Sequence, residues 1–214
     1  KSMGRESFQE IDQHAFFGAV AKAVLSPKDT NDIPRVTAEA VRLSTDGRPG
    51  PVVVQIPRDV SSMDTASAIP APAARTPHEA DAALVDKAVA MIDSAKAPLV
   101  VAGEMISNQN AADALTKFAA TAGLPVMSAY RRLDVMPNSH DCYAGHLEIN
   151  RFDNQLEAID QSDLIIAIGT RLDGITSADE TMFCTGKPLI HIYPAADILA
   201  RFESDVALDA DMES

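Results

Sequence analysis

The strongest constraint on the fold is an alternation of short apolar runs with amphipathic helical stretches between residues 77 and 214. Continuous apolar strands that alternate with helices are typical of a parallel sheet covered on both faces. The sequence therefore predicts an α/β fold with a doubly wound, Rossmann-like parallel sheet. The predicted strands are 97–102, 125–128, 163–168, 188–192 and 205–208, and the helices between and after them are 108–122, 152–161 and 195–201.

The first helix of this region is predicted to begin at a capping box. Thr76 and Glu79 have the spacing of that motif, and Pro77 suits the first turn. Gly123 is placed to end the helix over 108–122 in a left-handed conformation. The buried face of the first helix is predicted to hold Leu84, Ala88, Met91 and Ile92.

Ligands of doubly wound sheets bind beyond the carboxyl ends of the strands, where the strand order reverses. The loops that follow the predicted strands are therefore the candidate ligand-binding segments. These loops are 103–107, 129–134, 169–173 and 193–197.

Residues 1–62 predict an incomplete domain. A helix that opens at residues 32–34 and runs to about Thr45, with Val36, Ala40 and Leu43 on one face, precedes one apolar strand over 51–56, which we expect to be buried on both faces. One helix and one strand cannot close a sheet. The Ala- and Pro-rich stretch 63–76 reads as a linker. The predicted organisation is a partial α/β domain at 1–62, a linker at 63–76 and a central α/β domain at 77–214.

The charge balance excludes several classes of partner. The formal net charge is -13, and residues 75–214 hold 22 acidic against 10 basic side chains. Such a surface repels nucleic acid and anionic membranes. No apolar run approaches the roughly 20 residues of a membrane span, and no signal peptide is evident. Two distant cysteines, Cys142 and Cys184, fit a reducing compartment, so we expect a cytoplasmic protein.

The residue chemistry at the strand ends indicates an anion site without naming a reaction. Neither a dinucleotide nor a phosphate-loop glycine motif occurs, but Gly103 lies between a strand and a helix, where a phosphate can approach backbone amides. Arg131, Arg132 and Arg171 follow strands and can clamp a phosphate or carboxylate. Their alternative role is structural ion pairing, which the neighbouring acidic residues Asp173, Asp179 and Glu180 favour.

His140, Cys142 and His146 lie close together in sequence and could ligate a metal or form a nucleophilic pair. No fourth ligand lies nearby, so ordinary loop residues are the favoured interpretation. We predict no metal site.

Two stretches carry a family resemblance. Residues 4–10, Lys22, residues 32–35 and the Gly-Arg-Pro-Gly-Pro segment from Gly47, continued to Val60, resemble the acetolactate synthase group of thiamine diphosphate-dependent enzymes. There they match the second half of the pyrimidine-binding domain. Residues 98–103, 125–126, 140–145, 163–171 and 191–192 resemble the central domain of the same family.

The resemblance implies an enzyme that cleaves a 2-oxo acid with thiamine diphosphate and Mg²⁺ and passes the product carbanion to an acceptor, as a homodimer or homotetramer. The family's catalytic Glu lies upstream of the matched region, and no Gly-Asp-Gly diphosphate motif occurs here. We therefore assign no catalytic residue, and we expect this chain to be an inactive fragment that does not bind thiamine diphosphate by itself. The alternatives are a related decarboxylase, lyase or acetyltransferase, and a non-catalytic nucleotide-binding module.

By resemblance, Phe8, Gln9 and Lys22 border the substrate side of the active site. A flavin or ADP in the central domain is implied by some relatives. Departures from the synthase pattern at 129–134, at Gly145 and at Tyr193 weigh against FAD. The positions matching the cofactor side are Gly103, Glu104, Tyr130, Arg131, Gly169, Thr170 and Arg171.

Overall fold

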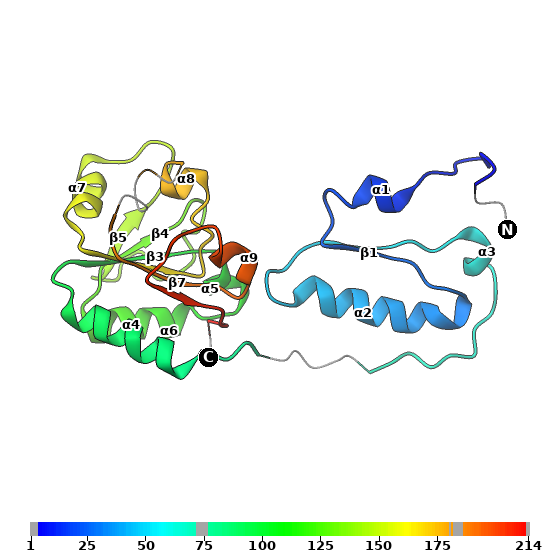
Figure 1. Cartoon of the computed structure of the whole chain (residues 1–214), viewed down its shortest axis with the longest axis horizontal. Helices are drawn as coiled ribbons and strands as arrows, with labels where there is room; N and C mark the ends of the chain where they lie inside the picture. The colour runs from blue at the N-terminus through cyan, green and yellow to red at the C-terminus, as the bar shows by residue number, and fades with distance from the viewer. Residues whose placement is uncertain (1–3, 72–76, 180, 182–185, 213–214) are drawn as a thin grey trace. The chain divides into compact units, whose positions relative to one another are not determined.

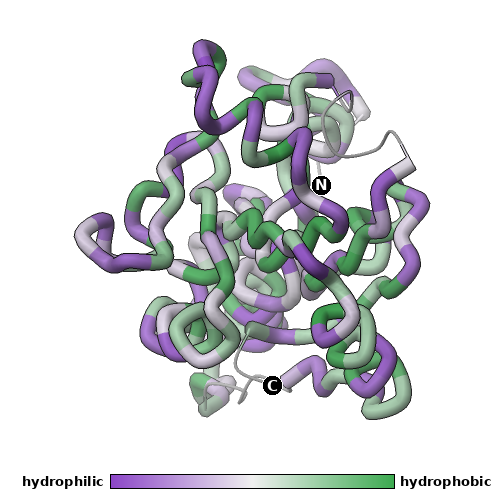
Figure 2. The backbone as a smooth tube through the Cα atoms, turned by 90° about the vertical axis from the view of Figure 1, so that its left-hand side faces the viewer, coloured by the Kyte–Doolittle hydropathy of each residue, from purple (hydrophilic) through white to green (hydrophobic). Residues whose placement is uncertain are grey.

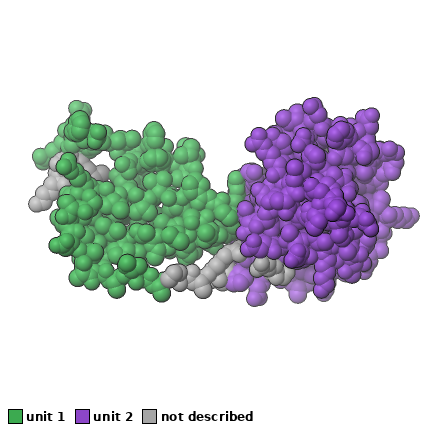
Figure 3. Space-filling model, turned by 180° about the vertical axis from the view of Figure 1, so that it is seen from behind, with its two compact units in different colours: residues 1–76 green, residues 77–214 purple. Residues whose placement is uncertain are grey.

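The computed structural model describes residues 4–71, 77–179, 181 and 186–212. The chain divides into two compact units, Lys1–Thr76 (unit 1) and Pro77–Ser214 (unit 2), which Figure 3 colours separately. No helix of the described residues is long and apolar enough to cross a membrane.

Unit 2 is built on a six-stranded sheet in the order β5-β4-β3-β6-β7-β8, and every neighbouring pair is parallel. The strand order reverses between β3 and β6, so the sheet is doubly wound and the predicted fold class is confirmed. Figure 1 shows α4 and α6 on one side of this sheet and α7 on the other. The strands are β3 (Pro98–Ala102), β4 (Val126–Ser128), β5 (Tyr143–His146), β6 (Leu164–Ile168), β7 (Leu189–Ile192) and β8 (Val206–Leu208).

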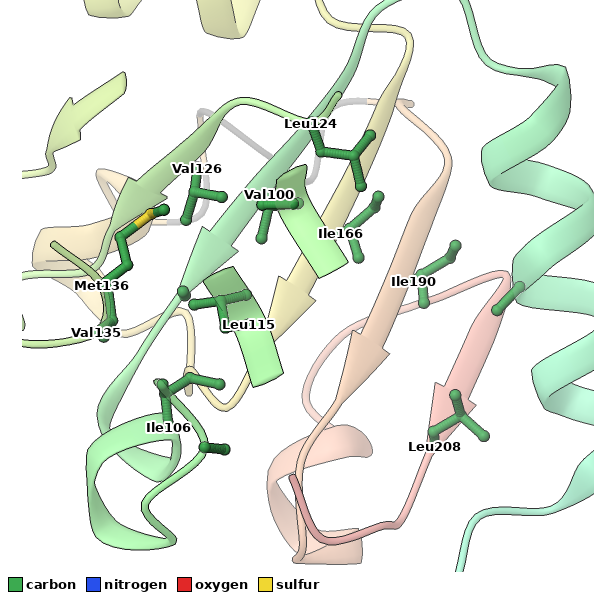
Figure 4. Close-up of a cluster of buried hydrophobic side chains, with 14 of the residues drawn as sticks. Val100, Ile106, Leu115, Leu124, Val126, Val135, Met136, Ile166, Ile190 and Leu208 are labelled. Carbon is green, nitrogen blue, oxygen red and sulfur yellow. The ribbon is translucent and has the colours of Figure 1, made fainter. Parts of the chain in front are cut away.

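Alternate strand residues fill a core on each face of the sheet. Val100, Val126, Ile166 and Ile190 project from four adjacent strands toward Leu115 of α6 (Ala112–Ala122) (Figure 4). Strands β3 and β6 are hydrophobic along their length because both faces of the sheet are covered. Figure 2 colours the backbone by hydropathy, and many of its purple, hydrophilic stretches lie in outer turns. On the opposite face, the core comprises Leu99, Val101, Met127, Leu147, Ile159, Ile165, Ala167, Leu172 and Leu189.

The first helix of unit 2 begins later than the sequence predicts. Helix α4 spans Ala82–Ser94, and its cap is Asp81, whose carboxylate accepts a hydrogen bond from the Leu84 N–H. The capping-box prediction is wrong, because residues 77–81 lie before the helix and Asp81 caps it. The backbone N–H of His78 donates to the carboxylate of Asp211, at 2.9 Å. Thr76 lies outside the described residues. The predicted apolar face packs as expected: Ala88 is buried, and Leu84, Met91 and Ile92 pack against the same core.

The segment after β3 contains two helices where one was expected. Helix α5 spans Glu104–Asn108, so the prediction of a loop over 103–107 is wrong. Asn110 has a φ of 57°, which breaks the chain direction before α6 begins. Gly123 ends α6 in the left-handed conformation, with a φ of 66°, as predicted.

Two elements carry no clear sequence signal. The edge strand β5 is only half-buried and contains Gly145 with a φ of 101°, so it lacks the apolar run that marks the other strands. Helix α8 (Gly174–Ser177) is one turn long and begins at Asp173, whose carboxylate accepts from two backbone N–H groups. The remaining helices of unit 2 are α7 (Asp153–Gln161) and α9 (Ala196–Leu199).

Unit 1 contains a second strand that the sequence did not indicate. Strand β1 (Ala23–Leu25) pairs in parallel with β2 (Val52–Val54), and helix α2 (Ile33–Thr45) buries Val36 and Ala40 against this sheet. The prediction that the strand near 51–56 is buried on both faces is wrong, because all three β2 residues are half-buried. The shorter elements are α1 (Gln13–Phe17), η1 (Thr30–Asp32) and α3 (Arg58–Ser61).

Candidate functional site

The candidate site of unit 2 lies at the carboxyl ends of β3 and β6, where the strand order reverses. The two strands run side by side from Pro98 opposite Leu164 to Ala102 opposite Ile168. Their loops therefore start next to each other. The two loops bring together five of the seven predicted cofactor-side residues: Gly103, Glu104, Gly169, Thr170 and Arg171.

The two glycines of these loops lie against the chain itself. A Cβ atom at Gly103 would come within 2.5 Å of both the Cα and the Cβ atoms of Thr170. Gly169 has a φ of 63°, and a Cβ there would come within 3.0 Å of Met105 Cβ and Met212 Sδ. Both positions require glycine because the loops approach each other so closely.

Glu104 is the centre of a polar network. Its Oε1 atom accepts a hydrogen bond from Arg171 Nε at 2.8 Å and another from the Tyr193 hydroxyl at 3.0 Å. Tyr193 is fully buried, and the Glu104 side chain is 20% exposed. The Nη2 atom of Arg171 also lies 3.9 Å from Oδ2 of Asp173. Arg171 is thus paired with carboxylates on both sides, which is the structural role that the acidic neighbours favoured.

Thr170 is held from the neighbouring strand by His191. The backbone oxygen of Thr170 lies 2.9 Å from His191 Nε2, and both residues are buried. Burial lowers the pKa of His191 below its usual value. A neutral imidazole therefore donates to the carbonyl, and it fixes the loop that carries Arg171.

Tyr130 and Arg131 lie farther along the same sheet edge, after β4. The guanidinium carbon of Arg131 lies 5.1 Å from the centre of the Tyr130 ring, a cation–π distance. Tyr130 lines a groove of about 620 Å³ together with Arg151, Arg171, Asp173 and others. Arg151 was not singled out from the sequence, because it follows a polar loop rather than a strand. It donates to the carbonyl oxygen of Ile175, and burial lowers its pKa.

The remaining charged candidates are Arg132, Asp179 and Glu180. Arg132 pairs with Asp134 at 2.9 Å, and Asp179 lines the groove together with Tyr130. Glu180 lies outside the described residues.

The His/Cys cluster has local partners. His140 Nδ1 accepts from the backbone N–H of Cys142 at 3.1 Å, and His146 Nε2 lies 3.2 Å from Glu148. Within the described ranges, no three His, Cys, Asp or Glu side chains are grouped to hold a metal ion. Cys184 lies outside those ranges.

In unit 1, the structure brings together two of the three predicted substrate-side residues. Phe8 and Gln9 line a groove of about 600 Å³ with Gln55, Arg58 and other residues. Phe8 is 92% exposed, and Gln9 has a φ of 61°, so this turn presents both side chains.

Lys22 points elsewhere. Its ammonium group donates to the backbone oxygens of Asp46 and of Arg48, the latter at 3.0 Å, at the carboxyl end of α2. The cation is well placed there because the end of a helix carries partial negative charge. Burial lowers the pKa of Lys22. The structure thus places Lys22 on the turn between α2 and β2, outside the groove of Phe8 and Gln9.

Comparison with known proteins identifies the family. Residues 85–214 match the model of the thiamine pyrophosphate enzyme central domain. The chain is 34% identical over 196 residues to the acetolactate synthase large subunit of Corynebacterium glutamicum, covering 88% of this chain and 31% of that protein. It is 27% identical to the corresponding subunit of Lactococcus lactis, covering 100% and 38%, and 29% identical to the glyoxylate carboligase of Escherichia coli O157:H7, covering 88% and 32%. The chain thus spans about a third of the length of these relatives. With the family model matched over most of unit 2, the chain belongs to the thiamine pyrophosphate enzyme family and contains its central domain.

Proposed function

We propose that this chain is part of a thiamine diphosphate-dependent enzyme that joins or cleaves 2-oxo acids in the manner of acetolactate synthase. The observation that carries the proposal is the match of residues 85–214 to the family's central domain, together with relatives named for acetolactate synthesis and glyoxylate carboligation. Both names describe the formation of a carbon–carbon bond. A transferase that carboligates is therefore favoured over a simple decarboxylase or lyase.

The domain assignment is part of this proposal. Residues 77–214 form the central domain, residues 63–76 are the linker, and residues 1–62 belong to the pyrimidine-binding domain. The extension of the similarity over the whole chain in the Lactococcus lactis relative supports the assignment of residues 1–62. The α2 helix on a two-stranded parallel sheet supports an α/β origin for that segment.

Phe8 and Gln9 are proposed to border the substrate. Thiamine diphosphate, when bound, supplies the electron sink for breaking the bond next to a carbonyl carbon. An exposed phenyl ring can exclude water from such a site, and an amide can orient a carboxylate. The groove that holds both residues also contains Arg58, whose guanidinium suits a 2-oxo acid carboxylate.

The described residues do not fit the cofactor's metal anchor. They contain no group of three metal-ligating side chains for the Mg²⁺ that carries the diphosphate. We therefore derive no step through the cofactor, and we propose that the 214-residue chain neither binds thiamine diphosphate tightly nor turns over alone. Isothermal titration calorimetry of the chain with Mg²⁺ and thiamine diphosphate tests this point, and tight saturable binding contradicts it.

The activity is tested on the product of the whole reading frame. With thiamine diphosphate and Mg²⁺ added, we expect consumption of pyruvate or glyoxylate with release of CO₂ and formation of a carboligated acid. Turnover of neither acid, nor of a panel of other 2-oxo acids, by a folded protein contradicts the proposal.

We further propose that the whole protein is a cytoplasmic homo-oligomer. Unit 1 exposes large apolar side chains, including Phe16, Val20, Val41 and Met63, each more than half exposed, and such surfaces mark sites of association. Light scattering on the whole protein tests this association, and a monomeric mass across a range of concentrations contradicts it.

A further inference from the structure

We infer that unit 2 closes its own dinucleotide crevice, so that FAD, ADP or another nucleotide is not taken up between β3 and β6. Arg171 and Tyr193 both donate hydrogen bonds to the carboxylate of Glu104 at the place where a Rossmann-like fold receives a pyrophosphate. The inference concerns the central unit alone and does not depend on the reaction proposed above.

The space beside the glycines is already filled. A glycine after the first strand of a dinucleotide fold leaves room for the pyrophosphate to approach the backbone. Here the room at Gly103 is taken by Thr170, which lies only 2.5 Å from the point that a Cβ atom of residue 103 would occupy and is itself 1% exposed. The room at Gly169 is taken by Met105 and Met212. A phosphate group is far larger than these gaps.

Three backbone donors of the loop, those of Gly103, Met105 and Ile106, are also engaged. The N–H groups of Gly103 and Met105 donate to the backbone oxygens of Ile168 and Gly169, each at 2.9 Å. The N–H of Ile106 donates to the oxygen of Gly103 at 3.2 Å. An anion bound here would have to displace these hydrogen bonds, whereas a phosphate site presents free N–H groups.

The charge at the crevice has the wrong sign for a pyrophosphate. The carboxylate of Glu104 lies in the first turn of α5, and it already uses the nearest cation, Arg171. Because β6 lies between β3 and β7 in the sheet, the hydrogen bond from Tyr193 to Glu104 crosses the carboxyl end of β6. The network thus replaces a ligand that would otherwise bridge these strands.

The ribose partner is missing as well. Dinucleotide folds place a carboxylate near the end of the second strand for the ribose hydroxyl groups. After β4 this chain has Tyr130 stacked with Arg131, and the first carboxylate, Asp134, is paired with Arg132 at 2.9 Å.

A binding experiment on the full 214-residue chain tests the inference without any turnover. FAD, ADP, NAD⁺ and NADP⁺ are each titrated by calorimetry. Because the protein has no Trp whose emission could report binding, FAD binding is also followed by the fluorescence of the flavin itself. A nucleotide present at about 100 times its Kd raises the unfolding midpoint by several degrees. We expect no saturable heat and no midpoint shift with about 1 mM of any of the four. Saturable binding of any one of them, with a raised midpoint, overturns the inference.

A second experiment separates an internal network from residues reserved for a ligand. We expect Tyr193→Phe and Glu104→Ala each to lower the unfolding midpoint in the absence of any nucleotide. The double variant should fall less than the sum of the two, because both changes break the same hydrogen bond. Asp197→Ala is the matched control, because it removes an exposed carboxylate 3.7 Å from Arg201 and should leave the midpoint unchanged. If Tyr193→Phe and Glu104→Ala behave like this control, the network is not structural and the inference fails.

Discussion

Replacing Gly103 with Ala measures directly how tightly the two loops of the crevice meet. The glycine has a φ of -127° and a ψ of -159°, which any residue can adopt, so the backbone conformation itself costs nothing. The new methyl group, however, would lie 2.5 Å from two carbon atoms of Thr170 and 2.7 Å from the oxygen of Gly169. Ordinary carbon contacts are about 3.5–4.0 Å long, so the overlap is about 1 Å.

The cost follows from what must move. Thr170 Cα is a backbone atom of a buried residue, so no flexible side chain can turn away. Overpacking of this kind costs about 1–3 kcal/mol. Separating the loops also strains the hydrogen bonds from Gly103 to Ile168 and from Met105 to Gly169, each worth about 1 kcal/mol net. We expect a total loss of about 3–5 kcal/mol in the free energy of unfolding.

The matched control is Gly123→Ala at the end of α6. This glycine has a φ of 66°, and a Cβ atom added to it would meet nothing within 4 Å, so Ala there meets only left-handed strain of about 1–2 kcal/mol. Urea unfolding followed by circular dichroism compares the two variants. A loss at Gly103 no larger than the loss at Gly123 would refute the reasoning, because the space beside Gly103 would then be open.

Three further predictions rest on single groups. Asp211→Ala should lower the free energy of unfolding by about 2–4 kcal/mol, because it leaves the N–H of His78 and the amide of Gln109 without their buried acceptor. The control is Asp209→Ala, which removes an exposed partner of the same histidine and should change the urea midpoint little. Because burial lowers the pKa of His191, the unfolded chain binds its proton more readily, so stability should fall as the pH drops below about 6.5, by at most about 1.4 kcal/mol per pH unit. His191→Gln should flatten that part of the profile, and an unchanged slope contradicts the assignment. Lys22→Met should lower the free energy of unfolding by about 1–2 kcal/mol, because the contacts of the ammonium group at the end of α2 are lost. Lys22→Arg should keep most of this stability, and a Lys22→Met variant as stable as the wild type would count against the anchoring role.

Local patterns were sufficient for much of the fold. The runs at β3 and β6 are apolar throughout, and β7 is apolar apart from His191, because both faces of the sheet are covered; this composition is visible without any tertiary information. Helix α2 and the glycine cap at the end of α6 were predictable for the same reason, since a helix face and a left-handed cap depend on neighbours a few residues apart. Strand β5 was not, because it is half-buried and lacks such a run, and β1 was not, because its apolar run is only three residues long.

The candidate site was predictable only in part. The rule that ligand loops follow parallel strands placed residues 103–107 and 169–173 at one edge of the sheet, where the structure brings these two segments into contact. It could not indicate what each side chain contacts. Lys22 illustrates the limit, because its partners at Asp46 and Arg48 depend on how β1 lies beside the turn after α2.

The sequence by itself determined the doubly wound α/β class and the edge of the sheet where chemistry is to be sought, because hydrophobic periodicity and strand–helix alternation are local properties of the chain. Only the tertiary structure decided which side chains contact one another at that edge and whether space for a ligand remains beside its glycines. The hydrogen bond between Tyr193 and Glu104 joins residues 89 positions apart, and the contact of Gly103 with Thr170 joins the ends of two strands that are adjacent only in the folded sheet. Whether a glycine faces open space or a neighbouring loop is a matter of packing between distant segments, and no local pattern encodes it.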